Sequence, residues 1–314
     1  MPSLAIRTDG LSRDFATLRA VDSLSLEVPE GTVFGFLGPN GSGKTTTIRL
    51  LLGLLAPTAG DIQVLGHDIR TGAPAIRAAS GALMEHSGLY ERLSAWENLD
   101  FFARVWHIPK GEREARIKEL LESIGLWERK DELVGTWSRG MKQKLAVLRT
   151  LLHRPRLVFL DEPTAGLDPI AAAVLRDDLL RLVADEGLTV FLTTHNLAEA
   201  ERLCSLVGVV RRGRLIAYGH PDDIRVAAAG NRLEVSGRSF TPAMLDGLRA
   251  REDVVGADVI NGRLCVELAP GGTTPPIVAF VVGAGGEIEE VRRAADSLED
   301  AFLNIVGEAE RDAG

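Results

Sequence analysis

One loop in this sequence has the residue types and the spacing that phosphate binding requires. Residues 38–45 read Gly-Pro-Asn-Gly-Ser-Gly-Lys-Thr, a complete G-x-x-x-x-G-K-[ST] pattern. Its glycines let successive backbone N–H groups converge on phosphate oxygens, assisted by the positive end of the following helix. Lys44 can reach the β- and γ-phosphates, and the Thr45 hydroxyl can ligate Mg²⁺. The residues predicted here to bind a nucleoside triphosphate are Gly38, Pro39, Asn40, Gly41, Ser42, Gly43, Lys44, Thr45 and Thr46.

The segments on either side of this loop favour a phosphate-binding loop over a plain turn between two elements. Residues 33–37 are an apolar run, which predicts a strand buried on both faces. Residues 46–52 predict an apolar helix that ends near Gly53 or Pro57. A glycine-rich turn can serve only to reverse the chain. The complete motif between a strand and a helix makes that alternative the weaker one.

Two carboxylates follow a second apolar run. Residues 157–160 are apolar β-formers, and Asp161 and Glu162 come directly after them. Ligands of open α/β sheets bind at the carboxyl ends of the strands. Beside a phosphate loop on a neighbouring strand, Asp161 is expected to hold Mg²⁺, directly or through water. Glu162, one residue further on, is expected to polarise an attacking water.

Other polar residues are expected at the same edge of the sheet. Residues 189–194 predict a further buried strand, which ends at His195. A single histidine is more often structural, but its place beside two other polar-tipped strands favours a role in the site. Glu85 and His86 follow a predicted strand that ends at Leu83, so these polar groups can face the nucleotide.

An aromatic residue precedes the phosphate loop in a region that predicts two strands joined by a turn, residues 4–28. Phe15 and Val21 flank the short connection 16–20. Phe15 is suited to stack on an adenine ring, although an aromatic residue in this setting is more often part of a core. We include Phe15 and Val21 among the predicted nucleotide-binding residues.

A second cluster begins at Trp137-Ser138-Arg139-Gly140-Met141, before a predicted helix over residues 142–152. Ser138 is suited to cap this helix, and a helix N-terminus can bind an anion. An ordinary capped helix explains these few residues equally well, so the local pattern alone does not decide between the two.

Length, charge and the apolar runs of the sequence limit the class of protein. With 314 residues the chain is too long for one compact α/β core and suits a large domain with a small one. Its net charge of −8 argues against a nucleic-acid partner, which would require a basic surface. The longest apolar runs are too short to span a bilayer, and the N-terminus lacks the apolar core of a signal peptide. We therefore expect a cytoplasmic protein.

The pattern of elements changes near the end of the chain. We predict one domain over residues 1–228, with a mainly helical part near residues 85–155, and a second domain over residues 229–314. The second domain shows alternating apolar residues and a hairpin signal at Asn261-Gly262. Helices are predicted over residues 242–249 and from Ser297, where a capping box begins. We expect a small α+β domain.

In this order the motifs resemble those of the nucleotide-binding subunit of an ATP-binding cassette (ABC) transporter, over about residues 4–224. Residues 38–45 resemble the Walker A motif, and residues 157–162 resemble Walker B with its catalytic glutamate. Residues 165–168 resemble the D-loop, which adds Asp168 to the predicted nucleotide-binding residues. His195 resembles the switch histidine of the family, and Phe15 the aromatic residue that stacks on adenine.

Two motifs differ from the family's usual pattern. The signature Leu-Ser-Gly-Gly-Gln is replaced by residues 137–141, in which Ser138 and Gly140 match and Trp137, Arg139 and Met141 do not. The resemblance implies that Ser138 and Gly140 contact the γ-phosphate bound to a second cassette. Where the family has a glutamine that serves Mg²⁺ and the attacking water, this sequence has Glu85, with His86 next to it. Glu85 is therefore a predicted metal ligand together with Thr45 and Asp161.

The resemblance implies an α/β fold: a P-loop NTPase cassette with a mixed-sheet core, an antiparallel β subdomain and a helical subdomain, followed by the small α+β domain. It implies an ATPase that uses ATP and Mg²⁺ and works with a separate membrane permease. Two cassettes are needed, and we expect a homodimer. The C-terminal region resembles the extension of drug-efflux members of the daunorubicin-resistance type, so an exporter at the inner face of the cell membrane is expected.

Two other hypotheses about the function are weaker. Soluble ABC ATPases that act on ribosomes or DNA usually join two cassettes or insert long coiled coils, and this sequence does neither. A binding module without hydrolysis would not need Glu162 and His195, which are both present.

Overall fold

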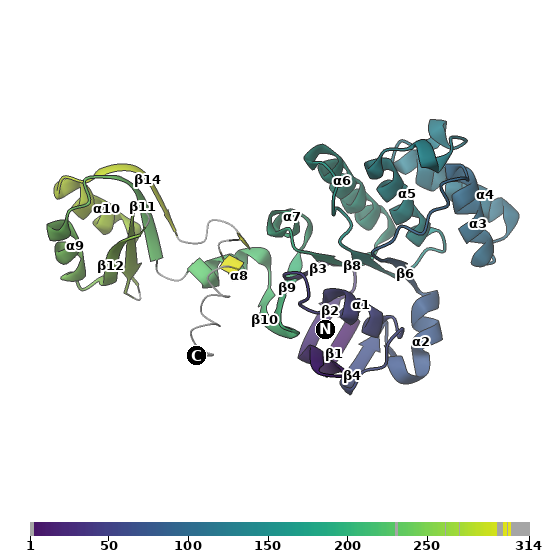
Figure 1. Ribbon diagram of the computed structural model, residues 1–314, viewed down its shortest axis with the longest axis horizontal. Coiled ribbons are helices and arrows are strands. Elements are labelled where there is room, and N and C mark those ends of the chain that lie inside the picture. Colours follow the sequence, from purple (N-terminus) through teal and green to yellow (C-terminus); the bar gives the residue numbers. More distant parts are fainter. Residues whose placement is uncertain are drawn as a thin grey trace. The chain divides into compact units, whose positions relative to one another are not determined.

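The computed structural model of the chain describes residues 3–229, 232–260, 262–269, 271–293, 298–299 and 301–302. The chain forms two compact units, Met1–Gly219 and His220–Gly314, which we call the cassette unit and the C-terminal unit (Figure 1). The sequence favoured a division after residue 228. The difference is the short helix α8 (Pro221–Ala229), which groups with the second unit because the cassette unit ends at the last strand of its sheet.

A six-stranded sheet forms the centre of the cassette unit. Its order is β10-β9-β3-β8-β7-β6, and every pairing is parallel except that of β9 with β10. The strands are β3 (Val33–Leu37), β6 (Ser80–Leu83), β7 (Leu157–Asp161), β8 (Thr189–Thr194), β9 (Leu206–Arg211) and β10 (Arg214–Gly219). Every residue of β3, β7 and β8 is buried, which explains why these strands read as continuous apolar runs.

An antiparallel sheet of order β2-β1-β4-β5 packs against the central sheet. It consists of β1 (Leu4–Phe15), β2 (Leu18–Pro29), β4 (Ala59–Val64) and β5 (His67–Asp68). The two sheets share one apolar core, in which the Phe191 ring lies 5.2 Å from Phe34 and 5.5 Å from Phe36. Helix α1 (Lys44–Leu51) contributes Ile48 and Leu51 to the same core. The predicted mixed-sheet core and antiparallel β subdomain are confirmed.

Helices α3 (Ala95–Val105), α4 (Lys110–Ser123) and α5 (Arg139–Leu151) lie together in the cassette unit (Figure 1). Helix α4 buries one apolar stripe, which includes Ile117, Leu120 and Leu121. The sequence predicted the helix after Ser138 to begin at Lys142, whereas α5 begins at Arg139 because Ser138 itself is the N-cap. The other helices of the unit are α2 (Ile69–Ala78), α6 (Pro169–Glu186) and α7 (Leu197–Leu203), with short 3₁₀ turns at Trp127–Arg129 and Val134–Thr136.

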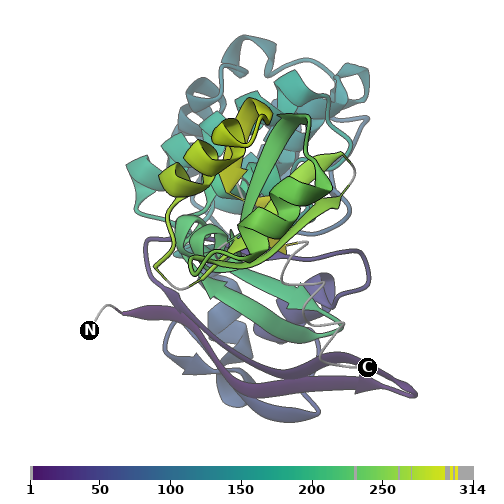
Figure 2. The same ribbon diagram turned by 90° about the vertical axis from the view of Figure 1, so that its left-hand side faces the viewer.

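The C-terminal unit contains an antiparallel sheet of order β12-β13-β11-β14 with two helices on one face (Figure 2). Its chain order is β11 (Arg232–Arg238), α9 (Pro242–Arg249), β12 (Val254–Ile260), β13 (Arg263–Leu268), α10 (Thr274–Gly283) and β14 (Glu287–Arg293). This βαββαβ order is the ferredoxin-like arrangement. The apolar core joins Leu248 and Val281 of the helices to Val235 and Leu264 of the sheet. Asn261 and Ser297, on which two of the sequence signals rested, lie outside the described residues.

Candidate functional site

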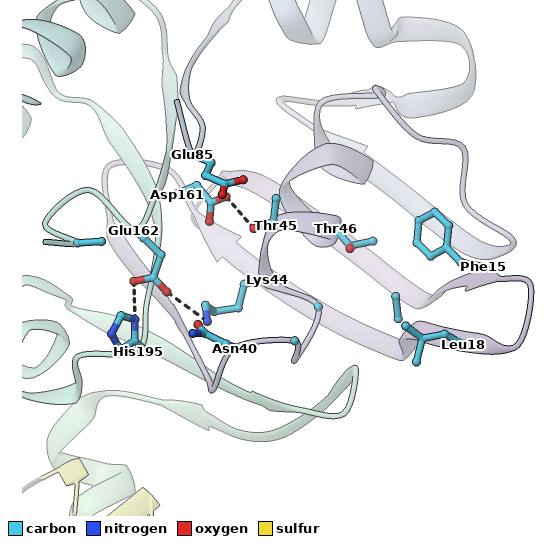
Figure 3. Close-up of a pocket in the computed structure, with 14 residues that line it drawn as sticks. Phe15, Leu18, Asn40, Lys44, Thr45, Thr46, Glu85, Asp161, Glu162 and His195 are labelled. Carbon is cyan, nitrogen blue, oxygen red and sulfur yellow. Dashed lines mark hydrogen bonds and ion pairs between the residues drawn. The ribbon is translucent and has the colours of Figure 1, made fainter. Parts of the chain in front are cut away.

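A cavity of about 680 Å³ lies at the carboxyl ends of the central strands (Figure 3). This volume lies within the range of small-molecule sites. It is lined by Phe15, Leu18, Ala20, Asn40, Gly41, Gly43, Lys44, Thr45, Thr46, Glu85, Asp161, Glu162, Ala165 and His195. Residues distant in the sequence therefore meet at one site, at the edge of the sheet where α/β folds bind ligands.

The loop between β3 and α1 has the conformation that its glycines allow. Gly43 has φ +102°, and a Cβ there would collide with the carbonyl oxygen of Ala20. Only glycine fits such a position without strain. Lys44 is buried, and its ammonium donates to the carbonyl oxygens of Gly38 (2.7 Å) and Pro39 (3.2 Å). Ser42 is also buried. The cavity is not lined by Gly38, Pro39 or Ser42, although all three belong to the predicted loop.

Asp161 ends β7 and accepts two hydroxyl hydrogen bonds. The Thr45 hydroxyl donates to one carboxylate oxygen at 2.7 Å, and the Thr193 hydroxyl of β8 donates to the other at 2.6 Å. Asp161 is only 6% exposed, so these bonds fix its direction. The register of the parallel strands explains the second bond, because Asp161 lies directly opposite Thr193. Sequence reasoning overlooked Thr193, although its position one residue before the strand end was a usable signal.

Glu162 lies between a lysine and a histidine (Figure 3). One carboxylate oxygen is 3.2 Å from the Lys44 ammonium, and the other is 2.8 Å from Nδ1 of His195. The backbone N–H of Glu162 bonds to Thr193, at 3.1 Å to both its hydroxyl and its carbonyl oxygen. Glu162 has φ +52°, an uncommon conformation for a residue with a side chain. Such conformations persist where surrounding contacts determine them, and they cluster at functional sites.

A buried carboxylate lies behind the segment that follows Glu162. Glu199 of α7 is 6% exposed and accepts a 2.5 Å hydrogen bond from the Thr164 hydroxyl. Burial raises the pKa of Glu199 above its ordinary value, because the charged form loses its water.

At the far end of the cavity the Phe15 ring is 39% exposed, and the guanidinium carbon of Arg13 lies 4.6 Å from its centroid. Leu18 and Ala20 also line this end, and they were not singled out from the sequence. Val21 is 1% exposed, belongs to the core and does not line the cavity. Side chains alternate along a strand, so Val21 points away from the face that carries Leu18 and Ala20.

The oxygen-bearing side chains of the cavity fit a magnesium ion. Thr45 and Asp161 are already hydrogen-bonded to each other, and Glu85 lies beside Asp161 (Figure 3). Mg²⁺ prefers oxygen ligands and usually binds proteins through one or two carboxylates together with substrate phosphates. His86, the alternative to Glu85, is not among the residues that line the cavity.

Besides Gly38, Pro39, Ser42 and Val21, three predicted nucleotide-binding residues that are distant in sequence from the phosphate loop also lie outside this cavity. Ser138 caps α5 and accepts from the Met141 N–H at 3.3 Å. Gly140 lies against α6, where a Cβ would come within 3.0 Å of Ala171. Asp168 caps α6 and accepts from the N–H groups of Ile170 and Ala171.

The sequence predicted that Asp161 and Glu162 follow a strand next to β3, but β8 lies between β3 and β7 in the sheet. A phosphate loop between a strand and a helix, with two acidic residues at the end of a nearby parallel strand, defines a P-loop nucleoside triphosphatase. The comparisons with known proteins narrow this class. Residues 21–165 match the family model described as ABC transporter. The daunorubicin resistance ATP-binding protein DrrA3 of Streptomyces coeruleorubidus is 38% identical over 99% of this chain and 98% of its own. The bacitracin transport ATP-binding protein BcrA of Bacillus licheniformis is 34% identical over 97% and 98%.

The solved structure of cbiO1 from Clostridium perfringens, part of the ABC transporter complex cbiONQ, matches with a TM-score of 0.67 and 27% identity. The match covers 71% of this chain and 91% of that one. The chain belongs to the ABC transporter family. It is the ATP-binding subunit of an ABC transporter, an ATPase that acts with a membrane permease. Among the described residues, no helix has both the length and the apolar character that crossing a bilayer requires.

Proposed function

We propose that the cavity binds ATP with Mg²⁺ and that Glu162 is the general base of hydrolysis. The observation that carries this proposal is the position of Glu162, 3.2 Å from Lys44 and 2.8 Å from His195 beside the phosphate loop. The N–H groups of residues 38–46 and the Lys44 ammonium bind the phosphates, and Phe15 stacks on adenine. Val21 supports this end of the site from the core and does not contact the base.

Thr45 and Asp161 would hold Mg²⁺, with Glu85 adding a third oxygen ligand. The ion supplies positive charge that neutralises the phosphate oxygens. Glu162 accepts a proton from the water that attacks the γ-phosphate. A positioned general base contributes about 10²–10⁴-fold in rate. His195 holds the Glu162 carboxylate in the required orientation through the 2.8 Å contact.

The site is completed by a second cassette, and we propose a homodimer. Ser138, Gly140 and Asp168 lie outside the cavity of their own chain, although the family pattern assigns them to the nucleotide. That separation is expected if they contact ATP bound to the partner. ATP between two cassettes then joins them, and hydrolysis releases them.

The transporter is proposed to be an exporter, with this subunit at the inner face of the cell membrane. The names of the relatives support this, since they include daunorubicin resistance and Nod factor export proteins. The C-terminal unit is proposed to adjust or dock the cassette without taking part in the chemistry.

The dimer is tested with Glu162→Gln, which keeps the shape of the side chain and removes the base. Light scattering coupled to size-exclusion chromatography should show an ATP-dependent dimer in this variant. Ser138→Ala added to it should weaken that dimer. A Glu162→Gln protein that remains monomeric at saturating ATP would contradict a homodimer.

A further inference from the structure

Two side chains of α5 contact the segment that follows Glu162. Arg139, the first residue of α5, donates to the carbonyl oxygen of Ala165 at 3.0 Å. Gln143 donates to the carbonyl oxygen of Pro163 at 2.7 Å. Residues four apart lie on the same face of a helix, so one face of the first turn of α5 contacts this segment twice.

The segment itself is a closed turn, which we call the Glu162 turn (Glu162–Ala165). The N–H of Ala165 donates to the carbonyl oxygen of Glu162 at 3.1 Å. Ala165 therefore receives a hydrogen bond from Arg139 at its carbonyl and gives one to Glu162 through its N–H. Ala165 thus links the Arg139 guanidinium to the backbone of Glu162 through two hydrogen bonds.

The contact between Arg139 and the turn is close. Gly166 has φ +70°, and a Cβ there would collide with the guanidinium of Arg139. The guanidinium thus lies directly against the backbone of Gly166. Where the family has glycine in its signature, this chain has Arg139, and a glycine would have no side chain to make either contact.

The Glu162 turn is also bound from other sides. The N–H of Glu162 donates to Thr193 of β8, and the Thr164 hydroxyl donates to Glu199 of α7. These contacts, together with those of α5, surround a residue with positive φ, a conformation that persists where neighbouring contacts hold it. Removing the Arg139 contact leaves Gln143 as the one α5 side chain that donates to a carbonyl of this segment.

We propose that Arg139 is a positioning residue for Glu162. It fixes the Glu162 turn through Ala165, and so keeps the carboxylate in the orientation that hydrolysis needs. Because Arg139 directly follows Ser138, the same contact connects the start of α5 to the Glu162 of its own chain. Both roles rest on the proposed function, in which Glu162 is the general base and Ser138 contacts the partner's ATP.

The test uses the full-length chain with Arg139→Ala and Arg139→Lys. Arg139→Ala should lower kcat for ATP hydrolysis by about ten- to a hundredfold, the scale of a small misplacement of a catalytic group, with KM for ATP unchanged. Arg139→Lys retains a donor of similar reach and should recover most of the rate. Lys142→Ala is the matched control, since it removes one positive charge from the same helix turn but contacts Glu91. Its rate should equal that of the wild type.

Two outcomes would overturn the proposal. One is an unchanged kcat in Arg139→Ala. The other is a loss of ATP-dependent dimerisation when Arg139→Ala is added to Glu162→Gln, since that would place the arginine's role at the partner's nucleotide and not at its own Glu162 turn.

A second measurement is independent of any activity. Hydrogen–deuterium exchange on the nucleotide-free protein should show faster exchange in a peptide covering residues 162–168 for Arg139→Ala than for Lys142→Ala. Unchanged exchange there would contradict the positioning role, whether or not the protein hydrolyses ATP. An inactive wild type with the predicted exchange difference would instead count against the proposed function alone.

Discussion

The cassette unit and the C-terminal unit place their charged side chains in different ways. In the cassette unit Lys44 and Asp161 are buried, and both lie at the carboxyl ends of parallel strands or in the loop that follows one. In the C-terminal unit one group of charges lies on the sheet face opposite α9 and α10. There Glu234 pairs across strands with Arg292 at 3.1 Å and with Arg263 at 3.5 Å.

Ion pairs alone therefore do not identify a functional site. The pairs of Glu234 lie along an antiparallel sheet, in contact with solvent, where such pairs contribute little. The pair of Glu162 and Lys44 lies where the ends of β3, β6, β7 and β8 converge, so residues that follow four different strands line one cavity. Parallel strands create that convergence, since all their carboxyl ends lie at one edge.

The largest expected effect comes from the phosphate loop. Lys44→Ala should weaken ATP binding and abolish measurable hydrolysis, because it removes the charge that we propose to contact the β- and γ-phosphates. Steady-state turnover and ATP binding would be measured on the folded variant. Lys110→Ala, which removes an exposed charge of α4, is the control and should change neither. Near-normal turnover in Lys44→Ala would contradict the assignment of the loop.

The next effect separates the two units. Leu248 of α9 is fully buried in the C-terminal core. Leu248→Ala should lower the stability of that unit by about 2–5 kcal/mol, while KM for ATP stays as in the wild type. Thermal unfolding would measure the loss of stability, and steady-state ATP hydrolysis would measure KM. If KM rose in step with the loss of stability, the C-terminal unit would contribute to the nucleotide site.

A smaller effect is expected at the adenine end of the cavity. Phe15→Ala should raise KM for ATP, with a loss of about 1–3 kcal/mol in binding and little change in kcat. Phe15→Trp keeps an aromatic face and should stay near the wild type. An unchanged KM in Phe15→Ala would contradict stacking on adenine and would indicate that Phe15 serves packing alone.

The smallest effect depends on pH. His153 is partly buried and stacks on Trp106 at 3.8 Å, and burial lowers its pKa below the ordinary value. The neutral form is favoured in the folded chain, so stability is present above the unfolded pKa of about 6.5 and is lost as pH falls below it. The unfolding midpoint of the cassette unit should therefore decrease between pH 7.5 and pH 5.5. In His153→Gln that dependence should be reduced, and an identical dependence in both proteins would rule out this histidine as its source.

Much of the site could be predicted because its residues are adjacent to strong local patterns. The phosphate loop, Asp161, Glu162 and His195 all follow apolar runs, and parallel pairing then brings them together. Val21 was placed at the nucleotide and is instead in the core, because a register shift between β1 and β2 separates it from the alternation of Leu24 and Leu26. No pattern in the sequence shows where a bulge falls.

Contacts between distant side chains were also beyond prediction. Arg139 appeared in the sequence only as a departure from the family's signature, and its bond to Ala165 depends on how α5 packs against the Glu162 turn. The structure divides the two units after Gly219, and not after residue 228, because α8 follows the last strand directly. Both the Arg139 contact and the boundary between the units depend on packing, which produces no periodic pattern in the sequence.

We propose that Glu162 is needed for hydrolysis of ATP and not for its binding. ATP binding and single-turnover hydrolysis should therefore be compared in the wild type and Glu162→Gln. We expect ATP affinity close to that of the wild type and a hydrolysis rate lower by about 10²–10⁴-fold. Hydrolysis at nearly the wild-type rate in Glu162→Gln would contradict it.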